Sequence, residues 1–230
     1  MTFGAKKCII SGVMVTLIFL RHGLSVTNNK GRFTGQIDAP LHERGEKQAQ
    51  EVAKYFKSGA ISVDRIYSSP SSRAYHTVLP TAAALNLPVE CVDELKEINV
   101  GNWSGRTFEE IEKSEPEKFR LFRENVGLAR YGDGESTGEA GERMVKAVKK
   151  IAEENEGKTV LISTHGGVLR ALYCAWNGIP LDKLKEVKIV PNASISVARF
   201  ENGKGQFTLL GFDEDLSEKT PYIPISKDMA

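Results

Sequence analysis

Two arginines and two histidines follow short apolar runs of this chain, and together they could handle a phosphate group. Arg21 and His22 come directly after one such run, Arg73 follows a second, and His165 follows a third. Arginine side chains match phosphate oxygens two at a time and neutralise charge during phosphoryl transfer. Nearby guanidiniums also lower the pKa of an imidazole, which keeps the ring neutral and nucleophilic near pH 7. These residue types therefore indicate phosphoryl transfer to a histidine nitrogen.

The apolar runs predict strands of a parallel sheet, which would bring these side chains together. Parallel strands end at a shared edge, where open α/β sheets bind their ligands. Alternating strands and helices predict an α/β fold, a doubly wound and mostly parallel sheet with helices on both faces. Strands are expected at residues 14–20, 63–67, 88–92, 158–163, 193–200 and 206–210, the last two joined by a hairpin at Asn202-Gly203. Helices are expected at residues 44–57, 73–85, 138–154 and 168–176, with a kink at Pro80.

A leaving alkoxide needs a proton, so a carboxylic acid should face the same edge of the sheet. Glu94 and Glu97 follow the expected strand at residues 88–92, and both are candidates for this acid. The acidic residues form no cluster of the magnesium type and the histidines lack zinc spacing, so we expect neither a metal nor another cofactor. The other two histidines, His42 and His76, are expected at the solvated surface.

The charge balance limits the kind of partner. The chain has 31 Lys and Arg against 30 Asp and Glu, which leaves a net charge of +1. This balance gives no overall field toward nucleic acid or an anionic membrane, so any phosphate affinity must be local. Neither is expected as a partner, and the expected substrate is a small phosphorylated metabolite. Cys8, Cys91 and Cys174 are odd in number and far apart, which favours a reducing, cytoplasmic location. Whether the chain forms a homodimer is left open.

We expect a single domain that carries an insertion. The domain covers residues 14–212, between an N-terminal extension at 1–13 and a C-terminal tail at 213–230. Met14 is a candidate natural start, and the apolar stretch that contains it is too short to span a membrane. Residues 102–135 are strongly charged and carry two short helical patterns, at 108–113 and 117–125. They are therefore expected to form a helical insertion over the sheet.

Six stretches resemble the histidine phosphatase superfamily, in the branch that includes cofactor-dependent phosphoglycerate mutases. The stretches are RHGLSVTN, GRFTGQIDAPL, IYSSPSSRAYHT, LKEINVGNWSG, DGES and STHGGVLRAL, and they occur in the order typical of the family. The resemblance covers the chain from about Thr16 to Phe212. A single stretch would be weak evidence, whereas six in order are highly specific.

The resemblance implies a role for each site residue. His22 would be the nucleophile, and Glu97, rather than Glu94, would be the proton donor and later the base. The implied phosphate and substrate contacts are Arg21, Asn28, Thr34, Gly35, Arg73, His165, Gly166 and Gly167. Three residues depart from the usual pattern of the family, namely Leu24, Ser71 and His76. None of them removes a group that the chemistry needs.

The sequence leaves three functions open and favours the first. A phosphatase is favoured over a phosphoglycerate mutase because Ile98-Asn99-Val100 follows Glu97, where similar mutases carry an arginine and then a basic, proline-rich insertion. A non-catalytic module that binds phosphorylated ligands is the third reading, and the complete set of pocket residues and acid argues against it. Specificity is expected in the insertion, whose arginines either contact the substrate or form a solvated charged face: Arg106, Arg120, Arg123 and Arg130.

Overall fold

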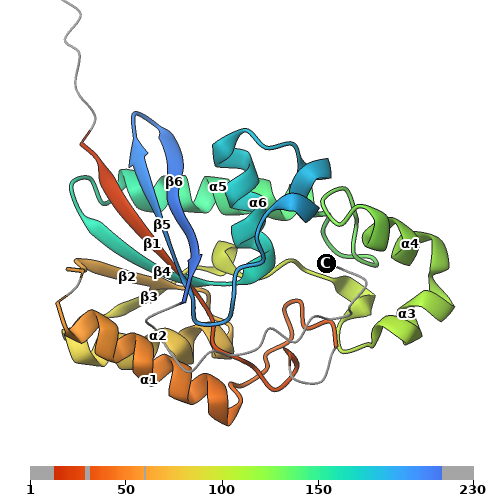
Figure 1. Cartoon of the computed structure of the whole chain (residues 1–230), viewed down its shortest axis with the longest axis horizontal. Helices are drawn as coiled ribbons and strands as arrows, with labels where there is room; N and C mark the ends of the chain where they lie inside the picture. Colours follow the sequence, from red (N-terminus) through yellow and green to blue (C-terminus); the bar gives the residue numbers. More distant parts are fainter. Residues whose placement is uncertain (1–12, 29–31, 60, 214–230) are drawn as a thin grey trace, which may run out of the picture.

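A six-stranded mixed sheet, in the order β3-β2-β4-β1-β5-β6, forms the centre of the molecule (Figure 1). The computed structural model describes residues 13–28, 32–59 and 61–213. The predicted extension and tail, apart from Val13 and Asp213, lie outside the described residues. The strands are β1 (Val15–Arg21), β2 (Arg65–Ser68), β3 (Val89–Cys91), β4 (Thr159–Thr164), β5 (Ile195–Glu201) and β6 (Lys204–Phe212).

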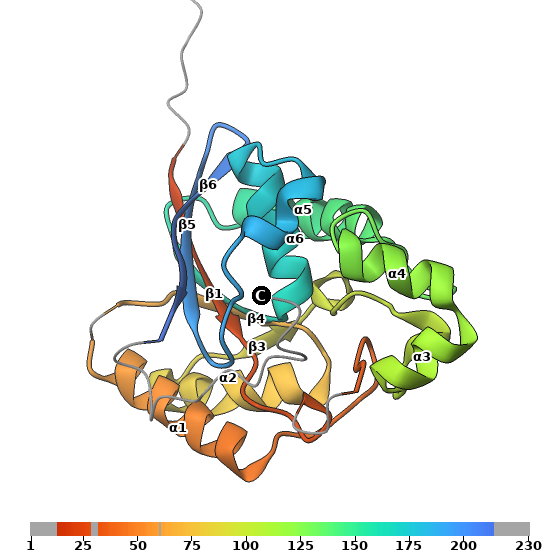
Figure 2. The same cartoon turned by 45° about the vertical axis from the view of Figure 1, so that its right-hand side comes forward.

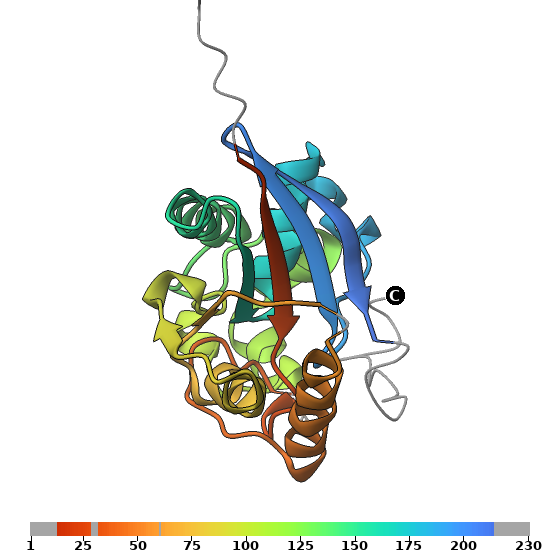
Figure 3. The ribbon, with the colours of Figure 1, turned by 90° about the vertical axis from the view of Figure 1, so that its left-hand side faces the viewer.

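Helices cover both faces of the sheet, as the sequence predicted. The helices α1 (Glu43–Lys57) and α2 (Ser72–Leu85) lie on one face, and α5 (Thr137–Glu153) and α6 (Gly166–Asn177) lie on the other (Figures 1 and 3). The alternation of β1 side chains divides the core between these faces. Leu17 and Phe19 belong to the cluster that includes the α5 and α6 residues. Ile18 and Leu20 belong to the cluster under α1 and α2.

The parallel pairing of three strands brings their ends to one edge. Strand β4 lies between β1 and β2 and is parallel to both, with Arg21 opposite Thr164 and Ser68 opposite Ser163. Strands β5 and β6 add an antiparallel pair on the far side of β1. They are joined by the expected hairpin, in which Asn202 and Gly203 both have positive φ, as a two-residue hairpin turn requires.

Several element boundaries differ from the prediction. Strand β1 begins and ends one residue later than expected, because Arg21 still pairs with β4. Strand β5 begins at Ile195 rather than residue 193, because Ala193 adopts a φ of 57° and its N–H donates to the Arg21 carbonyl. Helix α6 begins at Gly166, so the two glycines after His165 belong to its first turn. The 3-10 helix η4 (Leu181–Glu186) was not predicted, and α2 continues through Pro80 as one helix.

The expected insertion contains α3 (Phe108–Ser114) and α4 (Pro116–Glu124), which lie to one side of the sheet (Figure 2). Two 3-10 helices lead into it, η2 (Asp93–Leu95) and η3 (Gly101–Trp103). Trp103 is fully buried, and its ring packs against Phe33, Phe119, Phe122 and Tyr131. Its indole N–H donates to Glu115 Oε1 at 3.0 Å. The insertion is therefore continuous with the main core.

Among the described helices, none combines the length and the apolar character that a membrane span requires.

Trp103→Ala should strongly destabilise the fold. Removing a buried aromatic side chain from a packed core costs about 3–5 kcal/mol in the free energy of unfolding. Urea unfolding followed by circular dichroism measures this loss. Leu128→Ala serves as the control, because Leu128 is 56% exposed and its truncation should change the free energy by less than about 0.5 kcal/mol. Equal small losses for both variants would mean that Trp103 does not join the insertion to the core.

Candidate active site

His22 lies at the end of β1, with a buried side chain and one ring nitrogen fixed by the backbone. Its Nδ1 is 2.8 Å from the Gly23 carbonyl oxygen. A carbonyl can only accept a hydrogen bond, so Nδ1 carries the proton and Nε2 keeps its lone pair in the neutral ring. Burial, together with the charges of Arg73 and Arg21, holds the pKa of His22 well below 6.5, although the Gly23 hydrogen bond opposes this shift. The ring is therefore neutral at pH 7.

Two helices hold the turn that follows His22. The Gly23 N–H donates to Thr77 Oγ1 at 2.8 Å, and the Thr77 hydroxyl donates to the Arg73 carbonyl at 2.6 Å, both on α2. On α1, Gly45 packs so closely against the Leu24 carbonyl that a Cβ atom at residue 45 would overlap it. Sequence reasoning identified neither Thr77 nor Gly45, because no local sequence pattern distinguishes a helical threonine or glycine that contacts a distant turn from one that does not.

Arg73 is 1% exposed and is held by two backbone carbonyls. Its Nη1 donates to Ile37 O at 2.9 Å and its Nη2 donates to Gly35 O at 2.7 Å. Gly35 has a φ of 49°, a conformation that favours glycine. Burial lowers the pKa of Arg73 to about 10 against the opposing charge of Glu97, so the side chain remains a cation at pH 7. Its Nε is buried and has no hydrogen-bond partner among the described residues.

The first turn of α6 contacts Arg21 and Glu97 through two glycines. A Cβ atom at Gly166 would lie 3.1 Å from Arg21 Nε, and one at Gly167 would lie 2.6 Å from Glu97 Oε1. Arg21 also donates through Nη1 to the Val190 carbonyl, which ties the β1 end to the segment before β5. The two glycines let a guanidinium and a carboxylate approach the start of one helix.

Glu97 caps the N-terminus of α6. Its Oε2 accepts the Gly167 N–H at 3.0 Å, and its Oε1 accepts the N–H groups of Val168 at 3.1 Å and Ile98 at 3.0 Å. Such a carboxylate also complements the positive end of the helix dipole. Glu94, the other candidate acid, is exposed. Of the two glutamates, Glu97 is thus the one joined to this group of residues.

Arg143 of α5 fixes the backbone segment that carries Glu97. Its Nη1 donates to the carbonyls of Glu94 at 2.6 Å and Lys96 at 3.0 Å. Its Nε and Nη2 each lie 2.8 Å from a carboxylate oxygen of Glu135, which forms a bidentate ion pair. Sequence reasoning missed this pair: Glu135 stands out only as part of the DGES stretch and Arg143 only as part of a predicted helix, and no local pattern joins them.

His165 is fully buried and lies beside His22. The centroids of the two rings are 5.1 Å apart. Its Nε2 is 2.8 Å from Ser69 Oγ, in the turn after β2. Burial first, and then the charges of Arg73, His22 and Arg21, hold the pKa of His165 well below 6.5. The structure thus brings together the residues predicted from three strand ends.

Asn28 and Thr34 lie in a separate hydrogen-bonded group in the loop after Gly23. Asn28 Oδ1 accepts the Ser25 hydroxyl at 2.9 Å, and Thr34 donates to Thr27 Oγ1 at 2.8 Å. Their roles as phosphate or ligand contacts, and the ligand-lining roles of Gly35, Gly166 and Gly167, stay predictions.

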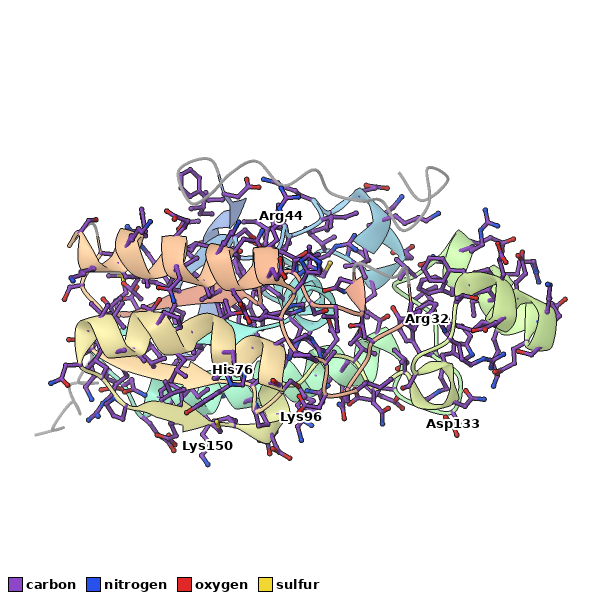
Figure 4. The ribbon with its side chains drawn as sticks, turned by 90° about the horizontal axis from the view of Figure 1, so that it is seen from below. Arg32, Arg44, His76, Lys96, Asp133 and Lys150 are labelled. Carbon is purple, nitrogen blue, oxygen red and sulfur yellow. The ribbon has the colours of Figure 1, made fainter. Side chains whose placement is uncertain are left out.

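The two remaining histidines differ in exposure. His76 is exposed on α2, as predicted, and lies at the surface in Figure 4. His42 is less exposed than expected: it is half-buried, and its Nδ1 caps α1 by accepting the Arg44 N–H at 3.2 Å.

The insertion arginines pair with nearby glutamates, which favours the reading of a solvated charged face. Arg120 is bonded to Glu117 and Glu124, and the other ion pairs are Arg106–Glu115, Arg123–Glu112 and Arg130–Glu139. Within the described part of the chain, no group of three or more His, Cys, Asp or Glu residues could hold a metal ion.

The chain matches known proteins over nearly all of the described fold. The model of the histidine phosphatase superfamily (branch 1) matches residues 17–213. Phosphoserine phosphatase 1 of Hydrogenobacter thermophilus is 36% identical over 205 residues, 89% of this chain and 96% of that protein. The metal-independent phosphoserine phosphatase of Arabidopsis thaliana is 32% identical over 197 residues, 85% of this chain and 80% of that protein. The solved structure of YhfR from Bacillus stearothermophilus has a TM-score of 0.83 at 31% identity and covers 88% of this chain and 100% of that one.

Two buried histidines, two arginines and a glutamate thus lie together at one edge of the sheet in an α/β fold. The chain belongs to the histidine phosphatase superfamily, and the expectation of a phosphatase-type enzyme is confirmed.

Gly45→Ala should impair the enzyme through the turn after His22. The new methyl group would displace the Leu24 backbone, at a cost of about 1–3 kcal/mol in stability, and kcat for an aryl phosphate should fall more than tenfold. Gly138→Ala, near the start of α5, is the matched control, because its methyl group would lie 3.5 Å from Leu181 Cδ1, an ordinary contact. Phosphate release and urea unfolding measure both variants. Equal activity in the two would contradict the role given to the Gly45 contact.

Proposed function

We propose that this chain hydrolyses a small phosphomonoester without a metal ion, through a phosphohistidine formed on Nε2 of His22. One observation carries the proposal: Nδ1 of His22 is bonded to the Gly23 carbonyl, which leaves Nε2 with a free lone pair beside two guanidiniums. A neutral imidazole pinned at one nitrogen is a nucleophile at the other. The arginines would balance the charge that develops on the phosphoryl oxygens.

In the first step, Nε2 of His22 attacks phosphorus and the bond from phosphorus to the ester oxygen breaks. Glu97 gives a proton to the departing alkoxide, which leaves as an alcohol. In the second step, water attacks phosphorus, Glu97 takes a proton from that water, and the bond from phosphorus to Nε2 of His22 breaks, which releases inorganic phosphate and restores the neutral ring. Among the described residues, Oε2 of Glu97 accepts one N–H, from Gly167, so it keeps a second acceptor position for these proton transfers.

Phosphoserine is the first substrate to test. Two of the similar proteins are named as phosphoserine phosphatases, one of them as metal-independent. A mutase would instead pass the phosphoryl group from the histidine to a second phosphorylated molecule. Incubation with phosphoserine and, separately, with 3-phosphoglycerate, both in EDTA, distinguishes these reactions by the release of inorganic phosphate. Release that depends on added divalent metal would contradict the metal-independent mechanism.

The covalent step predicts a labelled histidine. Rapid acid-free quenching during turnover of a ³²P-labelled ester should trap an acid-labile, alkali-stable label on His22. His22→Ala should abolish the label and turnover together, whereas His165→Ala should slow the reaction and leave His22 as the labelled residue. Label on His165 would reverse the assigned roles. Phosphate release without any label would mean that water attacks the ester directly.

Glu97→Gln should discriminate between leaving groups. The amide keeps the size of the side chain but cannot donate the proton, so hydrolysis of an alkyl phosphate should fall about 10²- to 10⁴-fold. Formation of the phosphohistidine from an aryl phosphate should fall much less, because a phenolate leaves without help. Glu94→Gln is the matched control and should leave both rates within about twofold. Equal losses on both kinds of substrate would remove Glu97 from the role of general acid.

A further inference from the structure

Ser69 provides the hydrogen-bond partner that the structure places on Nε2 of His165. Both side chains are fully buried, and the two atoms are 2.8 Å apart. Distance alone leaves open which of them carries the hydrogen. If Ser69 donates, Nε2 is the bare nitrogen and Nδ1 is protonated. If Nε2 donates, the reverse holds and the serine hydrogen needs another acceptor.

The surroundings of Ser69 favour donation by the serine. Its Oγ accepts the Ser71 N–H at 3.3 Å, so one of its lone pairs is engaged by the backbone. Among the described residues, Nε2 of His165 is the only hydrogen-bond acceptor found for the Ser69 hydroxyl. Donation to Nε2 leaves one group of this pair without a partner among the described residues, the Nδ1–H of His165, whereas the opposite direction leaves both the serine O–H and the bare Nδ1 without one.

Nδ1 of His165 then carries the ring's one proton. This atom is buried and has no hydrogen-bond partner among the described residues. The two nitrogens of an imidazole point in widely different directions, so Nδ1 faces away from Ser69. The ring lies next to that of His22, and the charges of Arg73 and Arg21 act on it as well. An N–H in this place is a donor for an oxygen of a phosphoryl group held between the histidines.

We propose that Ser69 is a positioning residue, which holds His165 as the neutral Nδ1–H tautomer so that His165 donates a hydrogen bond to the transferring phosphoryl group. The inference rests on the proposed function. The two histidines would then face the phosphoryl group with different atoms. His22 presents the lone pair of Nε2, because its Nδ1–H is bonded to the Gly23 carbonyl. His165 presents its Nδ1–H, because its Nε2 accepts the Ser69 hydroxyl. One ring is the nucleophile and the other stabilises the charge.

The tautomer can be read directly by two-dimensional ¹H–¹⁵N NMR of the histidine rings in the resting enzyme near pH 7.5. The His165 signals, assigned by their loss in His165→Ala, should show a protonated Nδ1 and an unprotonated Nε2. In Ser69→Ala the proton should move toward Nε2, and Ser69→Thr should restore the pattern of the unchanged protein. A protonated Nε2 in the unchanged protein would overturn the proposal. This reading needs no turnover, so it is independent of whether a phosphohistidine forms.

Kinetics supply the second test. Removing the fixed donor should lower kcat about 10- to 100-fold in Ser69→Ala, with the loss recovered in Ser69→Thr. The matched control is Ser68→Ala, because Ser68 is also fully buried and its hydroxyl donates to the Ser69 carbonyl at 2.8 Å rather than to His165. It should stay within about threefold of the unchanged protein.

A double-mutant cycle separates positioning from general damage to the fold. If Ser69 acts through His165, adding Ser69→Ala to His165→Ala should cost little further activity, because the ring on which it acts is already gone. If Ser69→Ala costs as much in that background as in the unchanged protein, its effect does not pass through His165 and the proposal fails. Failure of the proposed function would appear separately, as turnover without a labelled His22.

Discussion

The parallel pairing of β1 with β4 is the constraint on which the site depends. Its register sets Arg21, the last residue of β1, opposite Thr164, the last residue of β4. His22 and His165 are the next residues along the chain, so the two histidines lie at the same edge of the sheet. A slip of one residue would exchange the two faces of β1, moving Leu17 and Phe19 from the α5 and α6 side toward α1 and α2. The hydrophobic pattern of a buried strand thus fixes the placement of the two imidazoles that follow the strand ends.

Burial at this sheet edge determines the electrostatics of the site. Removing the histidines from water disfavours their charged form, and the neighbouring guanidiniums act in the same direction. Although burial lowers the pKa of Arg73 to about 10, the charge of Glu97 opposes this shift, and two backbone carbonyls accept hydrogen bonds from its guanidinium, which remains a cation at pH 7. Neutral rings and permanent cations therefore coexist within a few ångströms. That combination suits a nucleophile that must attack an anionic phosphate.

Much of this arrangement could be predicted from the sequence, because apolar runs fix strands and strand order fixes which residues share an edge. The strands, the main helices and the meeting of Arg21, His22, Arg73 and His165 follow from that logic. The contacts of Ser69, Thr77, Gly45 and Arg143 do not, since each depends on a tertiary approach that no local pattern records. The choice of Glu97 over Glu94 needed the family resemblance, and the structure supports it through the first turn of α6. The half-buried position of His42 was missed because histidine is a rare N-cap.

The two carbonyls that hold Arg73 have a consequence for the end of the catalytic cycle. The carbonyls of Gly35 and Ile37 already fix its guanidinium before any anion binds. Binding therefore avoids the entropic cost of ordering an arginine side chain, which is about 2 kcal/mol. If Arg73 contacts the phosphoryl group as proposed, the free ion produced by hydrolysis meets the same fixed donor as the ester did. Under the proposed function, inhibition of turnover by inorganic phosphate is therefore an expected property of this site.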